Sequence, residues 1–517
     1  MSNENKLLTN ATKLLSQEYN SALPNRYASN PVGVNNFATD ADSQIQWGYD
    51  TTVEWGRELD RNSPEVIPAM NALVSSVIGK GFVPSPDTGS DRLDKRLYEA
   101  FCEFSEDKFR FDYNHEFTYQ EAQEIIFRSA VRDGDVFVLP MAGGAIQIVE
   151  SQYCRNPDIP EPNNNTKDFL GKRKVNGVTI GYWFAENLND PPKYFPAYDN
   201  EGYALVWQIA FPKRAGLSRG VSTLNSVRDT AQMQTDCKLA TLYKAKINSM
   251  VCVVETDQQN PVGNIQPRTP GAPDRAQDYK LRPGATLRAN AGKNINFFQG
   301  NVPNPEFFPH VEMNNREICA VLGVPKESAF MDPTKANFSA LRQSIQDARQ
   351  IFESYQQKLI ARFHQPLWTH FIRTLIALNP SLRRHDIKDL LRCRFNPPRW
   401  KYLEPLTDAQ SDTERIRNRT ASYSMITRER HGVNADVIAE ETIRDTGFFI
   451  ERCAKEADRL SQLGVDVCWR EVASLATAPR GTLDHDDLMN HNDIPNDGIP
   501  GGGESEDKTQ GTENAAD

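Results

Sequence analysis

The sequence predicts an α+β fold in which helices and strands occupy separate stretches of the chain. Apolar residues recur every three or four positions over long stretches, most clearly over residues 338–367, and this spacing indicates amphipathic helices. Residues 135–149 instead alternate with a period of two, which indicates antiparallel strands. The repeated strand–helix alternation of a parallel sheet is missing.

The composition excludes several classes of protein. The 517 residues are 38% hydrophobic and 25% charged, which suits an elongated subunit or an oligomer with polar contacts. No stretch approaches the roughly 18 uninterrupted apolar residues of a membrane span. The polar N-terminus lacks the apolar core of a secretory signal. We therefore expect no membrane partner and a protein that begins in a cytoplasm.

The negative charge is concentrated at the C-terminus. The net charge is -10, and residues 484–517 hold ten acids against one lysine, a net of -9. The remaining residues are thus near -1, with no global basic signature for nucleic acid. Because residues 476–517 also contain few apolar side chains, we expect a disordered acidic tail.

Metal and cofactor chemistry has no signal in this sequence. The eight cysteines are scattered singly, and the eight histidines form no H-E-x-x-H motif. The sequence therefore predicts no metal site and no cofactor.

The N-terminal half predicts helices followed by strands. Residues 1–50 indicate a flexible arm with one helix near residues 6–19, and Ser63-Pro64-Glu65 is typical of a helix start. That helix should stop at Gly79 and Gly81. Further helices are expected at 91–106 and 118–132, and strands at 135–139, 145–149, 177–185 and 203–211.

The C-terminal half predicts long helices with one interruption. Prolines break the segment 255–277, and we expect a kink at Pro366 in the helix that starts near Phe338. The expected helices lie at 217–248, 305–322, 338–378 and after 398, with short strands at 280–287 and 294–298.

One motif raises the possibility of catalysis. Gly216-Leu217-Ser218-Arg219-Gly220 fits the G-x-S-x-G turn of serine hydrolases. Four residues separate it from the preceding strand, and no Gly-rich oxyanion segment lies upstream. We expect a loop near a helix start, with a nucleophilic Ser218 as the alternative.

The sequence lacks the phosphate-binding motif that a nucleotide-driven motor needs. A phosphate-binding loop needs Gly-x4-Gly-Lys-[Ser/Thr]. The nearest candidate, Gly292-Lys293, has Leu287 in place of the first glycine and Asn294 in place of the hydroxyl residue.

Segments in a consistent order resemble the lambda-like family of tailed-bacteriophage portal proteins. The most specific is Asp332-Pro-Thr-Lys-Ala-Asn-Phe-Ser-Ala-Leu-Arg342. The resemblance covers about residues 50–475. The other segments are 57–63, 72–81, 132–137, 146–150, 219–222, 281–284, 323–325, 398–400 and 404–405.

The resemblance implies a function without catalysis. It implies a homo-oligomeric ring, usually a dodecamer, at one capsid vertex, through which double-stranded DNA is packaged and ejected without sequence preference. The implied partners are the terminase large subunit, the major capsid or scaffold protein, and head-completion proteins. The implied locations are the virion and, during assembly, the host cytoplasm. A serine hydrolase using Ser218 and a non-portal head scaffold or adaptor protein remain the alternatives.

The family architecture divides the chain into a mixed wing, a two-helix stem, a small α/β clip, a long helix and a helical crown. The implied parts are an N-terminal arm (1–50), the first part of the wing (51–215), a stem helix (216–248), the clip (249–304), a second stem helix (305–323), a channel loop (324–337), the long helix with the rest of the wing (338–404), the crown (405–475) and the acidic tail (476–517).

The same architecture points to candidate site residues. The channel loop would converge on the DNA from every subunit, while the clip would dock terminase. Lys335 has an open alternative, in which it only caps or pairs with the following helix. The DNA-channel candidates are Lys326, Lys335, Asn337 and Arg342, and the terminase-docking candidates are Pro261, Pro267, Pro270 and Pro273.

Overall fold

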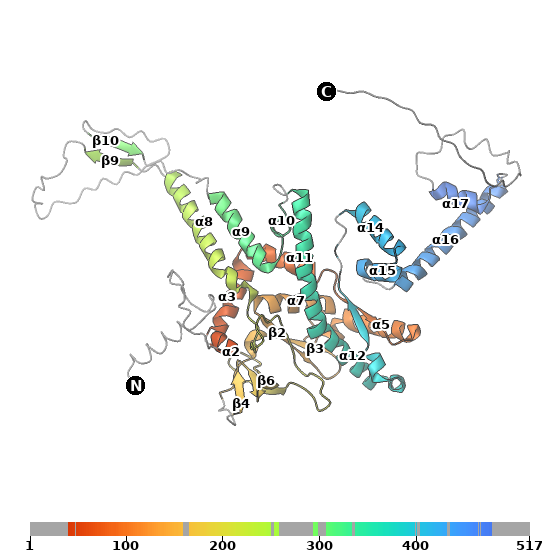
Figure 1. Ribbon diagram of the computed structural model, residues 1–517, viewed down its shortest axis with the longest axis horizontal. Helices are drawn as coiled ribbons and strands as arrows, with labels where there is room; N and C mark the ends of the chain where they lie inside the picture. The colour runs from red at the N-terminus through yellow and green to blue at the C-terminus, as the bar shows by residue number, and fades with distance from the viewer. Residues whose placement is uncertain are drawn as a thin grey trace, which may run out of the picture. The chain divides into compact units, whose positions relative to one another are not determined.

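The chain is described here from a computed structural model (Figure 1). It forms two compact units, Met1–Asn434 and Ala435–Asp517. Within the described ranges, no helix combines the length and apolar character that a bilayer span requires. The described residues are 40–46, 48–158, 165–249, 253–257, 293–297, 307–332, 337–398, 400, 404–431, 435–463, 465 and 467–477.

The first unit begins with helices and continues into antiparallel strands. Its early helices are α2 (Ala41–Ile45), α3 (Tyr49–Asn62), α4 (Val66–Val77), α5 (Asp91–Glu106), α6 (Lys108–Phe111) and α7 (Tyr119–Arg132). Its early strands are β1 (Val83–Pro86), β2 (Asp135–Pro140), β3 (Ile146–Glu150), β4 (Thr166–Phe169), β5 (Lys172–Val175), β6 (Val178–Phe184), β7 (Lys193–Pro196) and β8 (Trp207–Ala210), with a 3-10 turn at Ser151–Tyr153.

Long helices dominate the rest of the chain. The first unit continues with a 3-10 turn (Thr223–Val227), α8 (Arg228–Ser249), β9 (Val253–Asp257), β10 (Lys293–Phe297), α9 (Phe307–Leu322), α10 (Lys326–Phe330), α11 (Phe338–Leu359), a π turn (Ile360–His364), α12 (Gln365–Leu378), a 3-10 turn (Pro380–Arg384), α13 (Ile387–Leu390), β11 (Cys393–Asn396), α14 (Pro405–Arg417) and α15 (Tyr423–His431). The second unit contains α16 (Ala435–Gln462) and α17 (Trp469–Thr477).

The strands form four small antiparallel sheets. Their orders are β3-β2-β8, β4-β5-β6-β7, β1-β11 and β9-β10. The first sheet has β2 at its centre, and all but the last residue of β2 is buried. This sheet therefore lies inside the unit and has helices packed against it.

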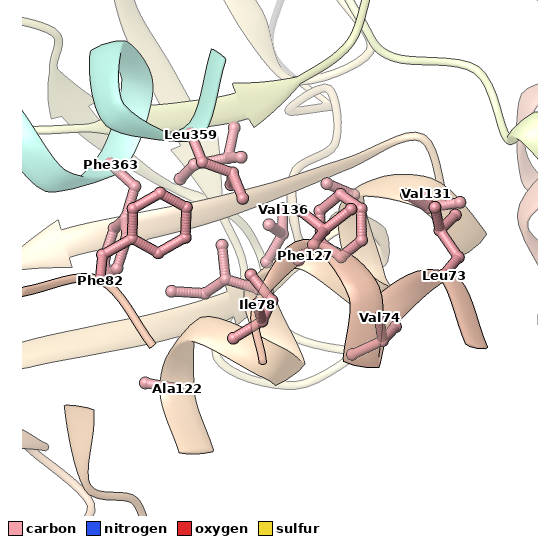
Figure 2. Packing of buried hydrophobic residues seen from close by; sticks show 14 of the residues in the cluster. Leu73, Val74, Ile78, Phe82, Ala122, Phe127, Val131, Val136, Leu359 and Phe363 are labelled. Carbon is pink, nitrogen blue, oxygen red and sulfur yellow. The ribbon is translucent and has the colours of Figure 1, made fainter. Parts of the chain in front are cut away.

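One large hydrophobic core joins the helices to the β2 sheet. Figure 2 shows side chains of α4, α7, β2 and the α11–α12 region converging, among them Leu73, Phe127, Val136 and Phe363. Each of these four is almost completely buried. Truncating an aromatic here, as in Phe127→Ala, should cost about 3–5 kcal/mol of stability because a cavity remains.

Several predicted elements are confirmed, with their local causes visible. Helix α5 spans the predicted 91–106, and α7 begins after Thr118, whose hydroxyl forms a capping box with Glu121. The predicted hairpin is β2 paired with β3. Helix α11 begins at Phe338 after Asn337, whose side chain accepts a hydrogen bond from the Ser339 amide.

Other predictions need correction. Helix α3 occupies 49–62, where no helix was predicted, and the next helix begins at Val66 rather than Pro64. The helix expected from Leu217 begins only at Arg228. The distortion expected at Pro366 is the π turn at Ile360–His364, which lies just before this proline in a continuous run from α11 to α12.

Some predictions fall outside the described residues. These are the helix near 6–19, the strand at 280–287, Lys335, the four clip prolines and the acidic tail.

Candidate functional site

The two long helices α8 and α9 lie side by side (Figure 1). Both carry exposed apolar side chains. Leu242 of α8 is 66% exposed and Phe308 of α9 is 65% exposed. Large apolar side chains gathered on one element mark a surface for another protein. The other exposed members of this set are Met233, Leu239, Tyr243, Met313 and Val321.

Polar contacts hold the first half of α8 to its neighbours. Lys238 pairs with Glu65, which precedes α4 and has a side chain only 3% exposed. The Gln234 amide reaches the same carboxylate and also donates to the Asn315 side chain of α9 at 2.8 Å. Helix α8 is thus held to α4 and α9 at this end.

Ser218 lies in the loop that leads to α8, and it is buried. Ser218 as a whole is 3% exposed, and its amide donates to Asp42 Oδ1 at 2.7 Å. Its hydroxyl donates to the same carboxylate and accepts from Lys174. A lysine could serve as a base, but a hydrolase serine must reach its substrate. The geometry gives no support to the hydrolase alternative.

The next residue, Arg219, forms the central ion pair of this loop. Its Nε lies 2.7 Å from Asp135 Oδ2 and its Nη2 lies 3.0 Å from Asp135 Oδ1, and both side chains are 0% exposed. The Asp135 carboxylate also accepts hydrogen bonds from Tyr49, Ser151 and Gln208, at 2.9, 2.8 and 2.9 Å. We call this set of five side chains, of which all but Gln208 are buried, the wing clamp.

Arg219 joins the loop to a further strand pair. Its Nη1 donates to the carbonyl oxygens of Cys154 at 2.8 Å and Leu170 at 2.6 Å. The guanidinium carbon also lies 4.7 Å from the Tyr49 ring centre. The wing clamp therefore connects α3, β2 and the β4–β5 turn to the loop before α8.

Opposing electrostatic effects act inside the wing clamp. Burial alone would raise the pKa of Asp135, but the Arg219 charge and the hydrogen bonds outweigh it, so this pKa lies below its ordinary value. Burial likewise opposes the charge of Arg219, while Asp135 holds the pKa of Arg219 well above its ordinary value. Burial raises the pKa of Tyr49. The pair is charged and fully hydrogen-bonded.

Two glycines permit the close approach that the wing clamp needs. Gly134 has a φ of +103°, and a Cβ at Gly220 would lie 1.9 Å from the Gly134 carbonyl oxygen. Only glycine fits at such a backbone crossing. The late start of α8 follows, because the backbone from Ser218 to Gly220 is bound to Asp42 and Asp135 instead of entering a helix.

The segment between α9 and α11 contains a short helix. Gly323 ends α9 with a φ of +70°, and α10 follows, packed against α4 and α9. Lys326, the first residue of α10, pairs with Glu312 of α9 at 2.7 Å, and its side chain is 17% exposed. The lysine is therefore engaged within its own subunit.

The predicted channel residues do not gather into one cluster. Asn337 caps α11, and Arg342 pairs with Glu404 at 2.8 Å. Lys335 lies outside the described residues. Each described candidate is thus bound to its own neighbour.

Sequence reasoning missed the pairing of Asp135 with Arg219. Both residues lie in segments that carry the family resemblance, 132–137 and 219–222. A single sequence contains no signal that brings residues 84 positions apart together.

Comparison with known proteins gives one strong sequence match. The family model described as "Phage portal protein, lambda family" matches residues 31–356, more than half of the chain. No curated protein is a significant match.

Solved structures add weaker likenesses. A chain from the neck of an empty gene transfer agent particle is 12% identical, with 72% of this chain and 90% of that chain covered and a TM-score of 0.43. An HK97 family phage portal protein from Corynebacterium diphtheriae is 12% identical, with coverages of 69% and 97% and a TM-score of 0.31. The family assignment depends on the sequence match alone.

Proposed function

The chain belongs to the lambda family of phage portal proteins, and from this premise we propose that it forms a closed ring of identical subunits, a dodecamer, at one vertex of the capsid. Portal proteins are structural rather than enzymatic. Double-stranded DNA would pass through the centre of the ring during packaging and ejection.

The observation that carries the proposal is the exposed apolar surface of α8 and α9. Seven large apolar side chains on the described parts of these helices remain exposed in the single chain: Met233, Leu239, Leu242, Tyr243, Phe308, Met313 and Val321. Burying such side chains against the next subunit would supply about 1.5–3 kcal/mol for each one fully covered. A heterologous contact repeated with closing rotation makes a ring.

The proposed channel segment is 324–337, between the second stem segment (305–323) and the part 338–404, which holds the long helix and the rest of the wing. Lys326 is paired with Glu312, Arg342 is paired with Glu404, and Asn337 caps α11, so phosphate contact near this segment would fall mainly to Lys335. Sparse contacts that touch only the backbone of DNA fix no sequence and resist passage weakly.

The proposed clip is 249–304. Its described parts, β9 and β10, pair in antiparallel register, and the chain between them holds Pro261, Pro267, Pro270 and Pro273. We propose that this segment docks the terminase large subunit. Replacing 261–273 with a Gly/Ser linker should leave rings intact and stop packaging, whereas normal packaging would contradict the assignment.

The remaining parts follow the family order. We assign the wing to 51–215 and 338–404, with stem segments at 216–248 and 305–323. The crown would be 405–475, although α14 and α15 belong to the first compact unit and α16 begins the second. The arm (1–50) and the acidic tail (476–517) flank these parts.

Location and further partners belong to the same proposal. We place the protein at the capsid vertex of the virion, and in the host cytoplasm during assembly. Its partners would be the major capsid or scaffold protein and head-completion proteins. The similar solved chains come from the neck and the virion of gene transfer agent particles.

Mass measurement and negative-stain imaging test the ring directly. We expect particles of very high mass with an axial hole and no esterase activity. A monomer at all concentrations, or a compact particle without a hole, would favour a scaffold or adaptor protein instead.

A further inference from the structure

A cavity of about 780 Å³ opens between α5 and α12, beside the β2–β3 turn. Its lining combines polar side chains with an apolar group that includes Leu97, Phe104, Phe371 and Leu375. Two exposed side chains form its lip: Phe109 is 65% exposed and Leu378 is 72% exposed. We call this cavity and its lip the α5–α12 groove.

The shape of the α5–α12 groove suits one kind of occupant. Two helices flank an apolar floor, which is how proteins bind the apolar face of a third helix. The rim carries charged side chains of both signs, so it does not favour a segment of one particular charge. Apolar complementarity must do so.

The N-terminal segment of the same chain has a matching pattern. Lys6-Leu7-Leu8 and Lys13-Leu14-Leu15 are the same triplet repeated seven residues apart, with Ala11 between them. At about 100° per residue, the four leucines and Ala11 fall on one side of a helix, and Thr9 and Ser16 fall on the opposite side. This segment precedes residue 31, where the family match begins.

We propose that residues 6–15 form an amphipathic helix that docks in the α5–α12 groove and inserts its leucines beneath Phe109 and Leu378. Residues 16–39 connect this segment to α2 and, when extended, could span about 80 Å. The segment can therefore reach the groove of its own chain or that of a neighbouring copy. Docking would satisfy both apolar surfaces at once. The inference goes beyond the ring and its DNA.

A photo-cross-linker tests the contact in the full-length chain. Replacing Phe109 with benzoylphenylalanine changes only an exposed lip residue, so the fold should be kept. We expect mass spectrometry to find cross-links to residues 6–15. Cross-links only to another segment, to another protein or to nothing would overturn the proposal.

Hydrogen exchange gives an independent test with a matched control. The variant Leu7→Asp/Leu14→Asp breaks the apolar stripe, and Thr9→Asp/Ser16→Asp adds the same charge to the polar side. We expect exchange in 96–115 and 371–382 to rise roughly tenfold in the first variant and to stay unchanged in the second. Equal exchange in both variants would overturn the docking. Neither readout requires a ring, so a negative result leaves the portal assignment standing.

Discussion

The wing clamp and the helices α8 and α9 differ in whether their side chains have partners within the chain. In the wing clamp, the side chains of Asp135 and Arg219 are 0% exposed, and both carboxylate oxygens of Asp135 accept hydrogen bonds from the same chain. On α8, Leu242 is 66% exposed and touches solvent in the single chain. The polar groups of the first region find their partners within the chain, whereas the apolar side chains of the second remain exposed in the single chain.

This difference indicates which region is rigid and which surface is available for contact with another subunit. A buried charge pair with full hydrogen bonding tolerates little displacement, because any shift leaves a charge without a partner. An exposed apolar helix face tolerates movement until it is covered. The wing clamp therefore fixes the loop that leads into α8, and we propose that the exposed surface of α8 and α9 provides the contact between subunits.

The largest effect should come from breaking the wing clamp. Asp135→Ala leaves the buried Arg219 charge unpaired, and we expect the free energy of unfolding of the first unit to fall by about 3–5 kcal/mol. Urea denaturation measures it. The control is Arg61→Met, which breaks the exposed pair with Glu58 and should change stability by less than about 0.5 kcal/mol. A similar small loss for Asp135→Ala would contradict the rigid role.

The wing clamp also predicts a direction for pH dependence. The pKa of Asp135 lies below its ordinary value of 3.8, because Arg219 and the hydrogen bonds outweigh burial. The stabilisation is therefore complete above about pH 3.8 and is lost as the pH falls through the lower folded value. Asp135→Asn should show a flatter acid limb in thermal melts between pH 5 and pH 2.

The stem surface should matter for assembly and not for folding. Leu242→Asp places a charge on a face that must become buried, so we expect at least a tenfold higher subunit concentration for ring formation, since each buried leucine contributes about 1.5–3 kcal/mol. Leu242→Met keeps the surface apolar and should assemble normally. Analytical ultracentrifugation separates the two results. Normal rings from Leu242→Asp would remove α8 from the interface.

The sequence predicted the elements better than their connections. Helices α5, α7 and α11 follow from apolar spacing and caps such as Thr118 and Asn337, because these signals act over a few residues. The late start of α8 could not be predicted, since it depends on Asp42 and Asp135 binding the backbone of a distant loop.

The candidate site shows the same limit. Lys326 was a DNA-channel candidate because it is a basic residue of the segment 324–337. In the structure it pairs with Glu312, which lies 14 positions earlier on a neighbouring helix. Composition reveals a charge and cannot show whether that charge is already neutralised. The family resemblance suggested a role for the segment, and only the fold shows which of its described side chains already have partners.

A smaller effect is expected at Ser218. Ser218→Ala removes the hydroxyl that Asp42 and Lys174 share, but the carboxylate keeps the Ser218 amide and Lys174 as partners. We expect a loss of about 1–2 kcal/mol in stability and unchanged packaging. If packaging stopped while rings and stability were preserved, a catalytic serine would have to be considered again.

The smallest effect separates the two lysines of the channel segment. Lys326 is paired with Glu312, so Lys326→Met should leave DNA passage unchanged after a modest loss of stability. Lys335→Glu would place a like charge near the phosphates. Two unit charges 4 Å apart interact by about 1 kcal/mol in water, so we expect packaging to slow by roughly fivefold or less, with steeper slowing at low salt. Single-particle packaging rates at two salt concentrations measure both variants. Equal rates for Lys335→Glu and the unmodified chain would place Lys335 away from the DNA and leave it as a partner of the following helix.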